Sequence, residues 1–122
     1  MIPPSIEITT LHAELCSSIS DPTRILVLYA LSEQPQNVTQ LTRILNLPQS
    51  TISRHLAILR SSGLVLPERN GREVLYALAD PRVIEALDLL RSILANRVSK
   101  HADKLNVSRA EEPANRHLCM WR

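Results

Sequence analysis

Residues 47–64 read LPQSTISRHLAILRSSGL, and this stretch decides the fold. Ile52, Leu56 and Leu59 are spaced at i, i+4 and i+7, which places them on one face of a helix. Gly63 follows the last apolar position, where glycine commonly ends a helix because it tolerates left-handed dihedral angles. The stretch therefore predicts an amphipathic helix with one face in a core.

The outer face of this predicted helix carries side chains that donate or accept hydrogen bonds. They are Gln49, Ser50, Thr51, Ser53 and Arg54. Such side chains can reach base edges in the major groove of DNA, while the amide groups of a helix N-terminus face phosphate. The pattern favours a DNA-reading helix, and an ordinary solvated helix face is the alternative.

The residues just before this helix predict a second, shorter helix. Thr39 can cap a helix that runs through Asn46, and residues 47–49 then form a tight link to the next helix. The apolar side chains that we expect to face inward are Leu41, Ile44 and Leu45. Two helices joined by a short link, the second polar on its outer face, predict a helix-turn-helix.

A β-hairpin is predicted directly after Gly63. Two β-prone runs, residues 64–69 and 72–78, flank Asn70-Gly71, a dipeptide typical of hairpin turns. The predicted tip presents Arg69, Asn70 and Arg72. A basic hairpin after a reading helix is a wing whose arginines can reach phosphates or the minor groove. The alternative is a hairpin that closes the core and has charges at a solvated tip.

Two helices are predicted before the helix-turn-helix. The first spans residues 5–19, with an apolar stripe made by Ile8, Leu11, Leu15 and Ile19. The second runs from Pro22 to about Ser32, with Asp21 as its N-cap. Because it is apolar on nearly all sides, we expect it to be the buried central helix.

The last predicted helix begins at Asp80-Pro81 and runs to about Leu105. A continuous apolar stripe runs along one face of this helix, made by Val83, Leu87, Leu90, Leu94 and Val98. A small domain has little core left to cover such a stripe, so we expect a homodimer formed through the first and last helices.

Composition and charge agree with a mostly helical DNA-binding domain. The 122 residues are 44% hydrophobic but only 2% aromatic, with no Phe, which predicts a core of aliphatic side chains. The net charge is only +2, but residues 39–76 carry five arginines against two glutamates. These arginines are Arg43, Arg54, Arg60, Arg69 and Arg72. A mildly basic middle third is suited to binding the phosphates of a nucleic acid. The alternative is that the uneven charge belongs to an ordinary solvated surface.

The sequence predicts one domain over residues 1–106 and a polar, flexible tail over residues 107–122. No stretch approaches the about 18 apolar residues that a membrane span needs, and no signal peptide is visible. The two cysteines, Cys16 and Cys119, do not form a disulfide framework. We therefore expect a cytoplasmic protein with no membrane partner.

Four motifs in this order resemble the ArsR/SmtB family of winged helix-turn-helix repressors. They lie at residues 20–24 (SDPTR), 48–56 (PQSTISRHL), 59–65 (LRSSGLV) and 70–76 (NGREVLY). The resemblance covers about residues 6–105. It implies a homodimer that binds a palindromic operator until an inducer weakens binding. The positions that match the family's DNA contacts are Gln49, Ser50, Ser53, Arg54, Arg69, Asn70 and Arg72; Thr51 is added for its expected exposure, and His55 is expected to pack structurally.

The usual metal sites of that family do not match this sequence. The stretch that would hold cysteines, residues 39–45, has none. At the last-helix site Asp80 fits, but the positions of the other ligands hold Arg82, Ile93 and Asn96. Arginine and isoleucine do not bind zinc, so we expect no metal at either usual site.

A different sensor is conceivable at the two cysteines. His12 and Cys16 share one helix face, and His117 lies close to Cys119 in the tail. If the tail folds back, these four residues could bind a soft metal or arsenite, or the two thiols could be oxidised. The alternative is a packed or interfacial Cys16 and an unpaired Cys119.

The sequence as a whole predicts a mostly α-helical winged helix-turn-helix with a small β-hairpin. Its predicted function is that of a dimeric, sequence-specific transcriptional repressor on double-stranded DNA, which an inducer releases, with Cys16 and Cys119 as candidate sensors. The alternative is a winged helix that binds DNA or a protein without a metal or thiol inducer. An enzyme that uses Cys16 and His12 has no further support, because no orienting acid and no oxyanion turn accompany the pair.

Overall fold

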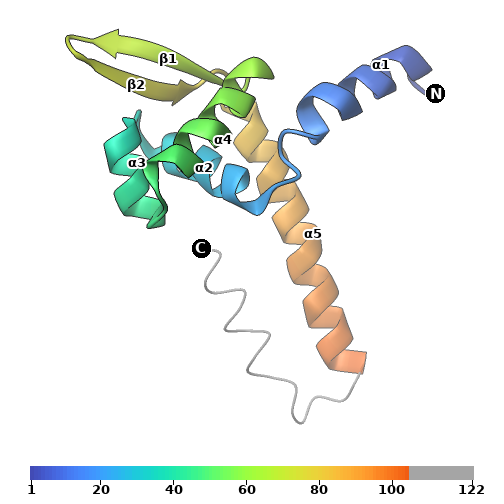
Figure 1. The fold of residues 1–122 in the computed structure, drawn as a ribbon. Coiled ribbons are helices and arrows are strands. Elements are labelled where there is room, and N and C mark those ends of the chain that lie inside the picture. Colours follow the sequence, from blue (N-terminus) through green and yellow to red (C-terminus); the bar gives the residue numbers. More distant parts are fainter. Residues whose placement is uncertain (105–122) are drawn as a thin grey trace. The chain divides into compact units, whose positions relative to one another are not determined.

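The structure, a computed structural model, describes residues 1–104. The order of elements is α1 (Ser5–Thr10), η1 (Leu11–Cys16), α2 (Pro22–Glu33), α3 (Val38–Leu45), α4 (Gln49–Ser61), β1 (Val65–Asn70), β2 (Glu73–Leu78) and α5 (Arg82–Lys104) (Figure 1). The chain divides into two compact units, Met1–Ile84 and Glu85–Arg122. The predicted tail lies outside the described residues, and so do His117 and Cys119.

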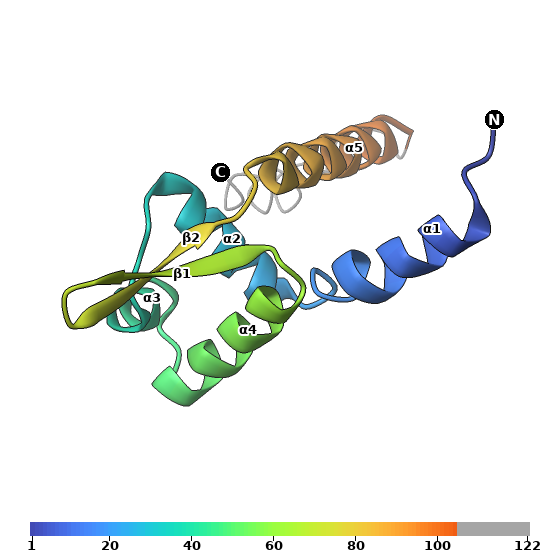
Figure 2. The same cartoon turned by 90° about the horizontal axis from the view of Figure 1, so that it is seen from above.

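Three helices and the hairpin build the core of the first unit. Helix α2 contacts α3, α4 and β2, while α4 also contacts α3 and β1 (Figures 1 and 2). The fully buried side chains are Val27, Leu28, Leu41, Ile52, Leu56, Leu59 and Val65. Burial of an aliphatic side chain of this size contributes about 1.5–3 kcal/mol, so this cluster is the main stabilising feature. The predicted inward stripe of α4 is confirmed.

Two apolar side chains that we expected to be buried are exposed. Leu26 of α2 is 54% exposed and Ile44 of α3 is 53% exposed. Helix α2 is central to the core, as expected, but one of its apolar faces is not buried. The expected inward orientation of Ile44 is wrong. Each helix packs with one face only, so a second apolar face stays at the surface of the chain.

The N-cap of α3 is Asn37, not Thr39 as we expected. The Asn37 side chain accepts a hydrogen bond from the Gln40 amide at 2.7 Å, and the Gln40 side chain accepts one from the Asn37 amide at 2.7 Å. This reciprocal pair is a capping box, which satisfies two amides at once. Thr39 lies within the first turn. Asn46 ends the helix with a left-handed φ of 56°.

The ends of α4 agree with the sequence prediction. Gln49 is the first helical residue, after Pro48. At the other end Gly63 has a φ of +80°, its amide donates to the Arg60 carbonyl at 3.0 Å, and the Leu64 amide donates to the Leu59 carbonyl at 3.0 Å. These two bonds form a Schellman motif, which requires the left-handed conformation that glycine supplies.

The predicted hairpin is present, but its turn lies one residue later than Asn70-Gly71. Asn70 pairs with Glu73 in the antiparallel register, so the two turn residues are Gly71 and Arg72. Gly71 has a φ of +69°, whereas Arg72 has a negative φ. A positive φ at the first turn position only is the pattern of a type II′ turn, which suits the twist of the strands.

The first predicted helix is shorter than expected and changes its winding. It ends at Cys16, before Ile19, and its second half, η1, is a π-helix in which the Ser17 amide donates to the His12 carbonyl at 3.0 Å. No residue of α1 or η1 is buried. The exposed side chains include Ile6 (73%), Ile8 (44%) and Leu11 (44%). Within the unit Met1–Ile84, the apolar stripe on this segment thus lacks a partner.

Helix α5 begins beside Asp80, as predicted. The Asp80 carboxylate accepts hydrogen bonds from the Arg82 amide at 2.9 Å and from the Arg82 guanidinium at 2.7–3.1 Å. Further along the helix, Leu89 (67%), Leu90 (56%) and Ile93 (56%) are exposed. No helix within residues 1–104 is both long and apolar enough to cross a membrane.

Candidate nucleic-acid interface

The outer face of α4 presents most of the predicted contact residues. Gln49, Ser50, Ser53 and Arg54 are exposed, whereas Ile52 is fully buried. Thr51 is only half-buried rather than open, so its predicted exposure is partly wrong. The face therefore offers one amide, two hydroxyls and one guanidinium in a row, which are groups that can pair with base edges.

The N-terminus of α4 also has unpaired amides. Pro48 occupies the N-cap, and no side chain caps this helix. The first capping bonds are those from the amides of Thr51 and Ile52 to the Pro48 carbonyl, both 3.1 Å long. The preceding amides, those of Gln49 and Ser50, lie at an exposed end, where an anion such as phosphate can accept from them.

The hairpin places its three predicted contact residues near its tip. Arg69 and Asn70 end β1, Arg72 lies in the turn, and all three are exposed. The hairpin is joined to the helical core by two backbone hydrogen bonds between Gln36 and Tyr76, 3.1 and 2.8 Å long. In addition, the Asn37 side-chain amide donates to the Glu73 carboxylate at 2.6 Å. The loop before α3 therefore holds the hairpin beside the helix-turn-helix.

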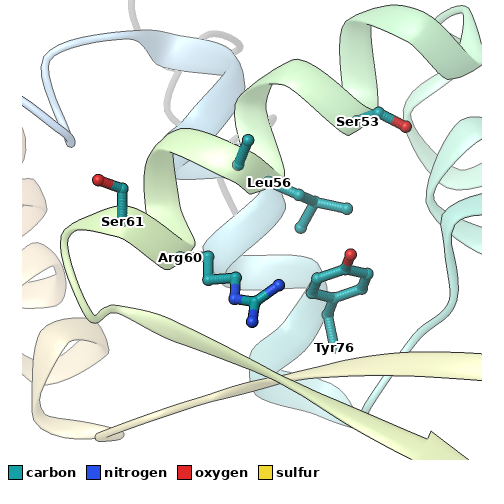
Figure 3. A pocket seen from close by; sticks show the side chains of 6 residues that line it. Ser53, Leu56, Arg60, Ser61 and Tyr76 are labelled. Carbon is teal, nitrogen blue, oxygen red and sulfur yellow. The ribbon is translucent and has the colours of Figure 1, made fainter.

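A hollow of 330 Å³ lies between α4 and Tyr76 of β2 (Figure 3). The lining residues are Ser53, Leu56, Ala57, Arg60, Ser61 and Tyr76. The sequence predicts no contact role for Arg60 or Tyr76. Arg60 counts only among the five arginines of residues 39–76. The seven-residue spacing from Ser53 to Arg60 is the signal that places both on one face of α4. The position of Tyr76 depends on strand register and on Gln36, which the local pattern does not reveal.

His55 lies on the inner side of α4 and is buried, as expected for a structural role. The Arg24 guanidinium lies 3.2 Å from its Nδ1 atom. Because arginine only donates, Nδ1 is the acceptor in this hydrogen bond. Arg24 also donates to the carbonyl of Ser18 at 2.6 Å and of Ser17 at 3.4 Å. One side chain thus joins α4 to the segment that follows η1.

Asp21 lies close to Arg24 in sequence, at the start of α2. Its carboxylate accepts a hydrogen bond from the Thr23 amide at 2.7 Å, which confirms it as the N-cap of α2. This bond is the main cause that lowers the pKa of the Asp21 carboxyl, and the positive charge of Arg24 lowers it further. The ionised form of Asp21 is therefore the form that the fold favours.

Comparison with known proteins decides the family. Residues 21–66 match the model of the "Bacterial regulatory protein, arsR family". The transcriptional regulator CmtR of Mycobacterium tuberculosis is 42% identical over 84 residues, which cover 68% of this chain and 71% of CmtR. The chain belongs to the ArsR family. The matched region contains α2, α3 and α4, the elements that carry the candidate reading face.

Two further comparisons extend this result. The transcriptional repressor SmtB of M. tuberculosis is 44% identical over 78 residues, which are 64% of this chain but only 58% of SmtB. The crystal structure of Rv0081 from the same organism superposes with a TM-score of 0.70 at 29% identity, covering 83% of this chain and 99% of that one. These relatives are described as transcriptional regulators, and the winged helix-turn-helix fold is shared.

The candidate sensor residues are only partly described. Cys16 is a free, exposed thiol at the end of η1, and His12 lies on the same π-helix. Within residues 1–104 no three His, Cys, Asp or Glu side chains come together in a way that could hold a metal ion. At the usual last-helix site, both oxygens of Asp80 are engaged by Arg82.

Proposed function

We propose that this ArsR-family chain is a dimeric, sequence-specific DNA-binding repressor that acts in the cytoplasm on a palindromic operator. The observation that carries the proposal is the exposed polar face of α4 beside a basic hairpin, both held on one three-helix core. A helix of this kind enters the major groove, while the hairpin contacts the adjacent backbone or minor groove. The repressor SmtB, a relative of this chain, supports the regulatory role.

Each group of residues has its own role in this proposal. Gln49, Ser50, Ser53 and Arg54 read base edges or contact the nearest phosphates, and the half-buried Thr51 contributes at the margin. The hairpin residues Arg69, Asn70 and Arg72 bind the backbone, which sets affinity more than sequence choice.

The dimer is proposed from the apolar surface that the chain leaves open. Ile6, Ile8 and Leu11 are exposed on α1 and η1, and Leu90 and Ile93 on α5. Exposed leucine and isoleucine side chains at helical spacing are commonly covered by a second copy in a symmetric dimer. Two copies would then present two α4 helices to successive major grooves, about one helical turn of DNA apart.

The test of DNA binding uses the fully reduced protein and fluorescence anisotropy. Two duplexes of equal length and composition are compared, one taken from directly upstream of the coding sequence and one with that sequence scrambled. We expect the upstream duplex to bind roughly a thousandfold more tightly. Equal affinity for the two duplexes would contradict a sequence-specific regulator and favour a winged helix of another kind.

The inducer is proposed to act through thiols, because Cys16 is a free and exposed thiol on η1, the same helix as His12. Arsenite, zinc and polysulfide are added in turn to the protein–DNA complex, with Cys16→Ser and Cys119→Ser as controls. If the reagent releases the protein from DNA only when both cysteines are present, a thiol or soft-metal sensor is supported. Release that neither substitution affects would show that the signal is not read through cysteine.

A further inference from the structure

The hollow between α4 and β2 brings together side chains from two elements that are distant in sequence. Ser53 and Arg60 extend from α4, and Tyr76 extends from β2 with its hydroxyl toward the helix (Figure 3). Tyr76 is fixed in place because its strand is paired on both sides, with Pro67 of β1 and with Gln36. The fold therefore fixes the position of the strand that forms one side of the hollow.

The polar groups in this hollow are all suited to an anion. None of its six lining residues carries a carboxylate, whereas Arg60 supplies a guanidinium and Ser53 and Tyr76 supply hydroxyl donors. Leu56 and Ala57 supply its apolar part, which reduces the screening of a charge that enters. Guanidinium and hydroxyl groups together match the oxygens of a phosphate.

The charge of Arg60 is available for such a ligand. Arg60 is exposed, and no carboxylate lies within ion-pair distance of it in the described part of the chain. By contrast Arg82, another exposed arginine, is paired with Asp80 at 2.7 Å. An unpaired arginine beside hydroxyl groups can form strong, charge-assisted hydrogen bonds with a phosphate.

We propose that Arg60 and Tyr76, together with Ser53, bind one backbone phosphate of the DNA strand that passes between α4 and the hairpin. The inference rests on the proposed function, because α4 in the major groove and the hairpin on the neighbouring groove leave one sugar-phosphate strand between them. The phosphate contact joins the reading helix to the wing and fixes their register on the duplex.

The first test measures affinity and its salt dependence for Arg60→Ala, Arg60→Lys and Tyr76→Phe, on the upstream duplex and on the scrambled one. For Arg60→Ala we expect about tenfold weaker binding to both duplexes, and a salt slope that falls by about 0.9 per bound subunit. Arg60→Lys keeps the slope because the charge remains, and Tyr76→Phe weakens binding severalfold with little change of slope. Arg82→Ala is the matched control, since it removes an equal charge that is already paired.

The second test replaces single phosphates of the duplex by uncharged methylphosphonate, one linkage at a time. In the wild-type complex each neutralised contact weakens binding. We expect one linkage per half-site at which methylphosphonate weakens binding of the wild type but does not weaken binding of Arg60→Ala. If Arg60→Ala weakens binding but responds to every methylphosphonate as the wild type does, the side chain acts only on the fold and the proposal is wrong.

The outcomes separate this inference from the proposed function. Unchanged affinity and slope in Arg60→Ala, with clear weakening in Arg54→Ala, would overturn the phosphate site and leave the regulator intact. Binding that neither substitution affects would overturn both. Melting temperatures of the free variants are measured alongside, so that an unfolded variant is recognised and Arg60→Lys then provides the comparison.

Discussion

At the scale of single residues, Arg54 is the side chain with the clearest role. It is exposed on the outer face of α4, between Ser53 and the buried His55. Arginine can make paired hydrogen bonds to guanine, and each such pair contributes about 1–3 kcal/mol of discrimination. We expect Arg54→Ala to weaken binding to the upstream duplex by this amount while affinity for scrambled DNA changes less. Anisotropy titrations with both duplexes measure the difference, and an equal loss on both would assign Arg54 to the backbone.

Arg72 is expected to behave differently, because it lies in the hairpin turn and not on α4. Arg72→Ala should weaken binding to all sequences alike and reduce the salt slope by about 0.9 for each lost contact. Titrations at several salt concentrations test this. A loss confined to the upstream duplex would mean that Arg72 reads bases instead.

Asp80 gives a pH prediction. The hydrogen bonds from Arg82 lower the pKa of its carboxyl to about 2, well below the usual value. A lowered pKa in the folded state means that the unfolded state binds the proton more readily, so this contribution to stability is present above about pH 4 and is lost as the pH falls toward 2. We expect the melting temperature to fall over this range, and to fall less in Asp80→Asn. Identical pH profiles in the two proteins would show that other carboxylates dominate.

At the scale of elements, the start of α3 gives a prediction with an internal control. Asn37→Ala removes the capping box and the bond to Glu73, and should lower the free energy of unfolding by about 1–2 kcal/mol. Thr39→Ala should change it by less than about 0.5 kcal/mol, because Thr39 is an exposed residue inside the first turn. Urea unfolding of both variants measures this. A larger loss in Thr39→Ala would restore Thr39 as the cap.

The elements that were predictable from sequence are those with strong local signals. The spacing of Ile52, Leu56 and Leu59, with Gly63 after them, predicts α4 and its C-terminal end. The prediction of Thr39 as the N-cap of α3 is wrong, although Gln40 three residues after Asn37 is the local spacing of a capping box. Likewise the Asn-Gly pair predicts a hairpin, but the register that moves the turn to Gly71-Arg72 depends on packing along the whole strand.

The residues of the candidate site also fall into those that local sequence patterns predict and those that they do not. Residues on one helix, such as Ser53 and Arg54, follow from helical spacing. Tyr76 joins them only through the strand pairing and its two bonds to Gln36, forty residues before it in the chain. The Arg24–His55 contact is also nonlocal, since thirty-one residues separate the two side chains. Contacts of this kind depend on tertiary structure, which periodicity does not encode.

At the scale of the whole molecule, dimerisation is the property on which operator binding depends. Leu90 is 56% exposed on α5, and a carboxylate buried in an apolar interface is costly. We expect Leu90→Glu to shift the protein to monomers in analytical ultracentrifugation and to weaken binding to the upstream duplex. Ile44→Glu, at a side chain with 53% exposure on α3, is the control and should stay dimeric. A dimeric Leu90→Glu protein would place the interface elsewhere.

The central claim is that the outer face of α4 reads DNA sequence, once in each subunit. The most direct measurement substitutes every base pair of the bound upstream site in turn and determines affinity for the wild type and for Arg54→Ala. We expect two symmetric positions, about one helical turn apart, where substitution costs the wild type about 1–3 kcal/mol and costs Arg54→Ala almost nothing. The same base-pair profile in both proteins would contradict the assignment of α4 as the reading helix.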